Sequence, residues 1–189
     1  MELSLFSHDL ISKDIAATLP AGYTLRPLQS GDHDRGVLDV LAVLTAVGEI
    51  SKPKFLERFE WLRRRNDSYF IIVIENESGR IVGVGSLLIE AKFIHSCALA
   101  GHIEDIAVAK SEQGKKLGIK IIHTLMDISE HVGCYKTTLV CADHNVAFYE
   151  KCGFVKGQNE MVRKSSTLLL GTFADKLLES VLRQEEAPN

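Results

Sequence analysis

A strand, a glycine-bearing turn and a helix are predicted in succession over residues 101–118, which read GHIEDIAVAKSEQGKKLG. Apolar Ile103, Ile106 and Val108 predict the strand, and the turn around Gly114 leads into the helix. The first N–H groups of a helix have no partner within it and lie at the positive end of its dipole, so this turn can bind a diphosphate. Positive charge around the turn comes from Lys110, Lys115, Lys116 and Lys120.

A second chemical feature is the segment NVAFYEKCGF at residues 145–154. The phenol of Tyr149 can donate a proton to a sulfur leaving group. The strand also carries the adjacent carboxylates Glu104 and Asp105, which face opposite sides of a regular strand. They can serve one ligand together only at a bulge, or through the backbone of one and the side chain of the other.

The elements that must position these residues follow from apolar spacing and from capping residues. We expect a loosely docked N-terminal arm over residues 1–18, a helix capped within residues 32–34, and a second helix capped by Ser51. The expected strands cover residues 23–28, 69–74, 81–89, 101–108, 135–140 and a last strand from Phe154. Residues 90–99 connect two of them, and further helices are expected at 114–131, 145–151 and 167–183.

The composition is that of one ordinary soluble domain of 189 residues, with 46% apolar and 25% charged residues. A net charge of -3 and a pI near 6.2 argue against nucleic acid as a partner. The four cysteines show no C-x-x-C pair, so a zinc site is not expected. Because the sequence contains no apolar run of about 20 residues and no signal peptide, we expect a cytoplasmic protein without a membrane span.

The motifs together resemble a known family. QGKKLG resembles the Q/R-x-x-G-x-G/A motif of the GNAT acetyltransferases, with Lys116 in the place of the inner glycine. The sequence over residues 19–161 is similar to the glucosamine 6-phosphate N-acetyltransferase family, on the basis of this motif and of GHIEDIAV, GCYKTTLVC and NVAFYEKCGF. The resemblance implies an α/β GNAT acyl-CoA N-acyltransferase fold, in which helices flank a mixed central sheet. It divides the chain into the arm 1–18, a GNAT domain 19–164 and an extra C-terminal helical extension 165–189.

The resemblance also implies roles for individual residues. Tyr149 would protonate the leaving thiolate, while Glu104 and Asp105 would orient the amine and accept its proton. The acetyl-CoA site would comprise Asp105, Ile106, Ala107, Val108, Gln113, Gly114, Lys115, Lys116, Leu117, Gly118, Asn145 and Tyr149. Here the strand residues 105–108 would run beside the pantetheine arm. No metal is implied.

For the sugar phosphate, the resemblance implies binding by Thr45, Lys92, His95, Glu104, Asp105, Tyr135, Lys136, and either Arg163 or Lys164. Those last two residues are adjacent, so they would face opposite sides of a strand, and only one of them can reach the phosphate. Val140 is a departure, because the family usually has a carboxylate there. Three alternatives stay open: Glu104, Asp105 and an ordered water are enough to bind and deprotonate the amine, or Asp143 reaches into the site, or the enzyme is slow or inactive.

The implied reaction moves acetyl from acetyl-CoA to the amine of D-glucosamine 6-phosphate. The product would be N-acetylglucosamine 6-phosphate, on the route to UDP-N-acetylglucosamine, made by a homodimer whose sugar site spans the interface. Two alternatives stay open. One is a GNAT enzyme for another small amine, and the other is a non-catalytic acyl-CoA-binding module, for which Val140 and the altered C-terminus would be signs of lost activity.

Overall fold

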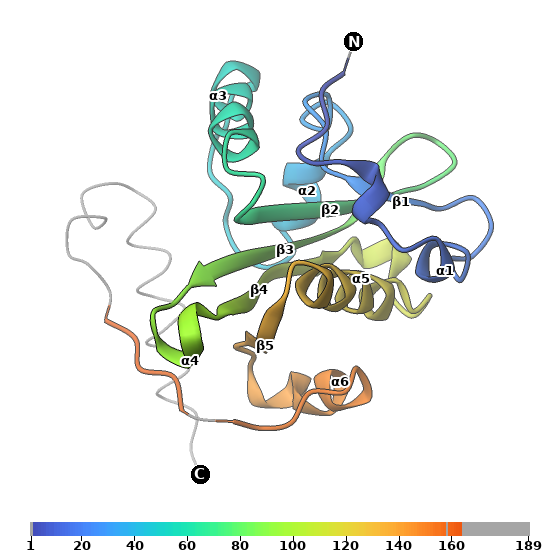
Figure 1. Ribbon diagram of the computed structural model, residues 1–189. Helices are drawn as coiled ribbons and strands as arrows, with labels where there is room; N and C mark the ends of the chain where they lie inside the picture. Colours follow the sequence, from blue (N-terminus) through green and yellow to red (C-terminus); the bar gives the residue numbers. More distant parts are fainter. Residues whose placement is uncertain (1, 158, 164–189) are drawn as a thin grey trace. The chain divides into compact units, whose positions relative to one another are not determined.

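The computed structural model describes residues 2–157 and 159–163 (Figure 1). The chain divides into two units at Lys156/Gly157, and the first of them contains all the helices and strands described below. Its centre is a five-stranded sheet in the order β1-β2-β3-β4-β5. The strands are β1 (Thr24–Pro27), β2 (Tyr69–Glu75), β3 (Ile81–Ala91), β4 (Leu99–Val108) and β5 (Cys134–Leu139). Neighbours pair antiparallel except β4 and β5, which are parallel, so the expected mixed sheet is confirmed.

Helix α5 (Leu117–His131) packs across one face of this sheet and contacts β2, β3, β4 and β5. Its buried residues Leu117, Ile121, Leu125 and Ile128 recur at helical spacing, as the sequence predicts. Two glycines let the helix approach closely. A Cβ on Gly85 of β3 would lie 2.4 Å from Ile121 Cγ2, and one on Gly101 of β4 would lie 2.5 Å from Ser129 Oγ. In Figure 1, α3 (Lys52–Arg63) lies on the opposite side of the sheet from α5.

Helix α2 (Val37–Leu41) begins after Gly36, so the predicted cap within residues 32–34 is wrong. The carboxylate of Asp32 is fully buried and accepts hydrogen bonds from Arg26 and Arg35 instead of capping a helix. Arg26 also donates to Glu75 on β2, and this buried network ties β1 to the loop that follows it. Helix α3 begins after Ser51 as expected, although the serine side chain makes no capping hydrogen bond.

The N-terminal arm is firmly packed, so the expectation of loose docking is wrong. It contains η1 (His8–Leu10) and α1 (Lys13–Ala16). Leu5, Phe6 and Ile11 are buried, at 0%, 4% and 4% exposure. The Leu5 N–H donates to the carbonyl of Leu28 at 2.9 Å, and the rings of Phe6 and Phe70 meet edge to face, 5.2 Å apart. The arm therefore completes the core beneath β1 and β2.

The predicted connection over residues 90–99 is shorter than expected, because β3 runs to Ala91 and β4 starts at Leu99. The short α4 (Ile94–Cys97) lies between these two strands in the sequence. After β5 come η3 (Asp143–Asn145) and α6 (Val146–Lys151). The predicted strand from Phe154 is wrong for residues 154–157 and 159–163, which contain no strand. Phe154 packs against Tyr149, but Val155 and Met161 are 87% and 92% exposed, so the apolar residues of this segment do not form the continuous covered face that a strand needs. The helix predicted at 167–183 lies outside the described residues.

Candidate active site

The turn between β4 and α5 has the conformation of an anion cradle. It passes through η2 (Lys110–Glu112), and Gly114 has φ +84°. No backbone N–H from Gln113 to Ile119 donates a hydrogen bond to any of the residues that the structure describes. Seven consecutive donors at the positive end of a 15-residue helix suit a diphosphate, which supplies acceptor oxygens and negative charge.

The backbone restricts which residues suit two positions of this motif, Lys116 and Gly118. Lys116 is exposed at the N-cap of α5 with φ +62°, a left-handed conformation that glycine adopts more readily. The lysine that replaces the motif's inner glycine is therefore accommodated, at the expense of some backbone strain. Gly118 faces Phe148 of α6, where a Cβ would lie 3.3 Å from Phe148 Cζ. This glycine thus lets α6 lie close to the start of α5.

The side chain of Lys115 is engaged within the protein. Its Nζ donates to Glu112 Oε2 at 2.6 Å and to the hydroxyl of Tyr23 at 2.8 Å, and Tyr23 in turn donates to Glu112. The hydrogen bonds that Lys115 donates to Glu112 and, to a lesser extent, to Tyr23 raise the pKa of Lys115. Sequence reasoning missed Tyr23 and Glu112, because they lie 89 residues apart and neither belongs to a local motif.

Strand β4 carries a bulge at the two predicted carboxylates. Ser86 pairs with Glu104 and Val84 with Ala107, so Gly85 alone faces both Asp105 and Ile106. Asp105 has φ +55°, and both carboxylates are exposed. Of the two arrangements that would let adjacent residues serve one ligand, the structure contains the bulge.

Beyond this bulge one edge of β4 is open. The parallel pairing of β4 with β5 ends at Ile103 and Leu139, whereas β4 continues to Val108. No strand among the described residues pairs with that side of residues 104–108. An extended ligand with amide groups can hydrogen bond to such an edge in the manner of an added strand.

Tyr149 of α6 is half-buried, and its ring meets those of Phe148 and Phe154 edge to face, with centroids 5.0 and 6.2 Å away. Burial raises the pKa of its phenol, and electrostatic interactions with Cys141, Cys152 and Glu104 add to that effect. The structure thus brings the phenol within electrostatic reach of Glu104. A phenol with a raised pKa keeps its proton at neutral pH, as a proton donor must.

Val140 follows the last residue of β5 and is 57% exposed. It therefore presents an apolar surface at the position where the sequence resemblance implies a carboxylate. Asp143, the alternative carboxylate, is exposed in η3. Asn145 occupies the N-cap of α6 without a side-chain capping bond and is exposed.

Four of the predicted phosphate-binding residues form a separate group at the other end of β4 and β5. The rings of His95 and Tyr135 lie 4.8 Å apart, and Lys136 Nζ lies 5.5 Å from the Tyr135 centroid. Lys92 forms an ion pair with Glu90 at 2.6 Å, and Glu90 also bonds to His102. His95 has φ +53° and begins a turn of three left-handed residues.

Among the described residues of the first unit, no hydrogen bond or ion pair joins Thr45 to either group. Thr45 is exposed in the loop between α2 and α3. Arg163 is exposed and belongs to the second unit of the chain, while Lys164 lies outside the described residues.

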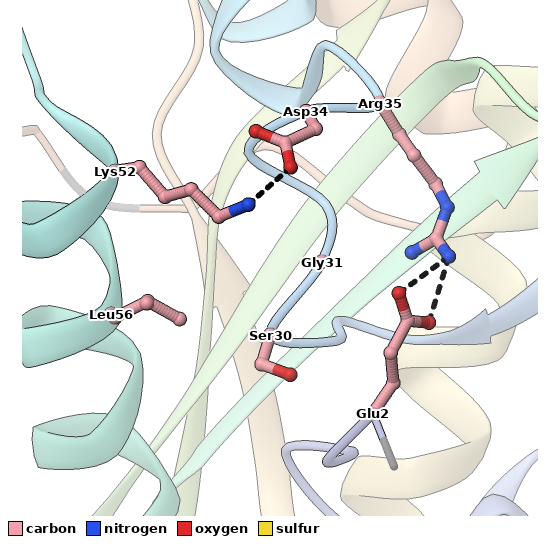
Figure 2. A pocket seen from close by; sticks show the side chains of 7 residues that line it. All are labelled: Glu2, Ser30, Gly31, Asp34, Arg35, Lys52 and Leu56. Carbon is pink, nitrogen blue, oxygen red and sulfur yellow. Dashed lines mark hydrogen bonds and ion pairs between the residues drawn. The ribbon is translucent and has the colours of Figure 1, made fainter.

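A pocket of about 520 Å³ lies apart from all these residues, between the N-terminal arm, the loop after β1 and helix α3 (Figure 2). Its lining residues are Glu2, Ser30, Gly31, Asp34, Arg35, Lys52 and Leu56. Its two cations are already paired, Arg35 with Glu2 and Lys52 with Asp34. In the described part of the chain, no group of three or more His, Cys, Asp or Glu side chains is arranged to hold a metal ion. That part also has no helix with the length and apolarity to cross a bilayer.

The chain is similar to several known proteins. The model of the acetyltransferase (GNAT) family matches residues 35–154. Glucosamine 6-phosphate N-acetyltransferase of Candida albicans is 49% identical over 144 residues, covering 76% of this chain and 97% of that protein. The Arabidopsis thaliana enzyme of the same name is 43% identical over 132 residues, covering 69% and 89%. Its crystal structure superposes with a TM-score of 0.74 at 40% identity, covering 75% and 97% of the two chains.

Proposed function

Because the chain belongs to the acetyltransferase (GNAT) family, we propose that it transfers acetyl from acetyl-CoA to the amine of D-glucosamine 6-phosphate. The product is N-acetylglucosamine 6-phosphate, a precursor in UDP-N-acetylglucosamine biosynthesis. One observation carries the proposal: the open edge of β4 leads directly into the turn and the first residues of α5, where seven consecutive N–H groups have no partner among the described residues. This junction fits the extended arm and the diphosphate of a coenzyme.

The residues divide the work in the following way. The N–H groups of 113–119 hold the diphosphate, and residues 105–108 align the arm, whose thioester supplies the acetyl group. Glu104 and Asp105 orient the amine and accept its proton, directly or through water. As the new C–N bond forms and the C–S bond breaks, Tyr149 gives its proton to the departing sulfur.

The same proposal makes the enzyme a homodimer with a shared sugar site. The group of His95 and Tyr135 lies near Leu99, at the start of β4. Leu99 is five residues from Glu104, so their backbones are about 16 Å apart along the strand at about 3.3 Å per residue. The proposal assigns the phosphate to the first group of one protomer and the amine to the second group of its partner. A partner copy related by a twofold axis supplies the missing group.

A mixing experiment tests the shared site. Lys136→Ala and Tyr149→Phe chains, each weakly active alone, are unfolded together and refolded. Random pairing of the two chains restores about a quarter of wild-type activity, because half of the dimers then contain one intact site. A monomer in light scattering, or no recovery on mixing, contradicts the proposal. The proposed location is cytoplasmic, which the four free thiols support.

The activity itself is tested by release of free thiol from acetyl-CoA with glucosamine 6-phosphate, glucosamine or a polyamine as acceptor. We expect release with the sugar phosphate and much slower release with the other two. Fast release with another amine would keep the fold and change the acceptor. Coenzyme binding without release would favour a non-catalytic module, the alternative that the exposed Val140 raises.

A further inference from the structure

Three side chains near the coenzyme turn form a closed cluster, which we call the Tyr23 latch: Tyr23, Glu112 and Lys115. The Tyr23 hydroxyl donates to Glu112 Oε2 at 2.5 Å, and Lys115 Nζ donates to both partners, at 2.6 and 2.8 Å. Lys115 Nζ also lies 5.5 Å from the centre of the Tyr23 ring. Each member therefore contacts the other two.

The latch joins segments that are distant in the sequence. Tyr23 lies in the loop before β1, whereas Glu112 and Lys115 lie in the turn before α5. The other hydrogen bonds that the turn makes within the described residues are local, from Glu112 N to Ala109 O, from Gln113 Nε2 to Val108 O and from Lys120 N to Lys116 O. Because Gly114 and Lys116 both have positive φ, the turn needs an external restraint to remain in one conformation.

Within the latch, the positive charge of Lys115 balances the negative charge of Glu112. The Glu112 side chain is 15% exposed, and hydrogen bonds from Lys115 and then Tyr23 lower the pKa of its carboxyl group. An unpaired carboxylate in this turn would repel a diphosphate. Lys115 compensates that charge, so its ammonium group is not a free cation for the ligand.

We propose that Tyr23 and Glu112 are positioning residues of the coenzyme site, which hold the turn 110–116 through Lys115 so that its N–H groups are in place before the diphosphate binds. The inference rests on the proposed function, because it takes the ligand of this turn to be the coenzyme. A turn that is already ordered spares the entropy of ordering it on binding, and the benefit appears as affinity. The reaction itself takes place at Glu104 and Tyr149, outside the latch.

The test compares Tyr23→Phe, Glu112→Gln and Lys115→Met with the wild type. Calorimetric titration with CoA is expected to show a Kd raised roughly five- to tenfold in each variant. The KM for acetyl-CoA rises to match, while kcat and the KM for the amine stay unchanged. The Tyr23→Phe/Glu112→Gln double variant is expected to lose no more than either single variant, because the three groups act as one unit. Tyr69→Phe is the matched control, since that hydroxyl makes no hydrogen bond within the described residues.

S-acetylpantetheine, which lacks the diphosphate, separates positioning from general damage. Its kcat/KM should be the same in the wild type and the latch variants. An equal fall with both donors would overturn the inference, because it would mean that the variants disturb the fold. A loss of CoA affinity in Lys115→Met with none in Tyr23→Phe would also overturn it, because the effect would then come from the charges of Lys115 and Glu112 and not from the position of the turn.

The wild type distinguishes this inference from the proposal beneath it. If wild-type protein binds CoA no more tightly than S-acetylpantetheine, the turn does not hold a diphosphate and both fall. If CoA binding depends on the diphosphate but Tyr23→Phe binds CoA as tightly as the wild type, the positioning role of the latch is wrong and the proposed function stands.

Discussion

Ile103 of β4 lies directly opposite Leu139 of β5 in the last pair that the two parallel strands form. The next residues along the strands, Glu104 and Val140, therefore lie at the same level where the strands separate. An exposed valine thus stands beside the proposed proton acceptor, at the position where the sequence resemblance implies a second carboxylate. This relationship leads to the first prediction.

Val140→Asp should raise turnover with glucosamine 6-phosphate, by roughly 10²-fold if the new carboxylate acts as a general base. The physical reason is that valine can neither accept a proton nor hold an ammonium group. Thiol release measures the gain, and Val140→Asn is the control with similar size and no negative charge. Equal rates in all three proteins would mean that Glu104 and Asp105 suffice.

Tyr149→Phe should fold normally and lose a factor of about 10² to 10⁴ in kcat. The ring contacts with Phe148 and Phe154 remain in the variant, and only the proton donor is removed. Thiol release at saturating substrates gives kcat, and CoA titration checks that coenzyme binding is intact. Unchanged turnover would reject the assignment.

The pH profile should carry the signature of Tyr149. Burial raises the pKa of this phenol, so the protonated form persists above the ordinary value of about 10. Below its pKa the phenol can donate, and kcat falls as pH rises through that pKa. The alkaline limb of kcat should therefore lie above about pH 10. The limb should vanish in Tyr149→Phe, with circular dichroism confirming that both proteins stay folded.

Lys116→Gly should stabilise the protein by about 0.5–1 kcal/mol, because it relieves a side chain held at φ +62°. Lys110→Gly, in the adjacent η2 where φ is not positive, should instead destabilise by a similar amount. Urea unfolding measures both. Two variants that change in the same direction would show that net charge, and not backbone conformation, decides the outcome.

Asp32→Ala should destabilise the fold by about 3–5 kcal/mol, because it leaves the buried guanidinium of Arg26 without one of its carboxylates. Asp39→Ala removes an exposed ion pair with Arg80 and should change stability by less than about 1 kcal/mol. Urea unfolding compares them, and equal losses would contradict the importance assigned to burial.

Much of the fold follows from local sequence pattern. The hairpin of β2 and β3 and the apolar face of α5 are confirmed because periodicity and turn residues report on neighbours in the chain. The arm was mispredicted because its short apolar pieces carry no period, and only the distant Phe70 and Leu28 explain their burial. Asp32 resembles a helix cap in the sequence, and its partner Arg26 is revealed only by the folded chain.

The candidate site divides in the same way. Gly114 and Lys116 lie within one continuous motif, so the sequence identified them. The bulge at Asp105 was one of two alternatives that the sequence left open, and the strand pairing decides between them. Tyr23 and Glu112 belong to no motif, because their relation arises from tertiary packing across 89 residues. The separation of the His95 group from the Glu104 group depends on strand register, which the sequence does not specify.

The buried arm matters for anyone preparing the protein. A version that begins at residue 19 would lack Leu5, Phe6 and Ile11 and would expose Phe70 to water. Such a fragment would be prone to aggregate and to be cleaved by proteases, although every motif for chemistry would be intact. Purification tags therefore belong ahead of the arm, separated from it by a spacer.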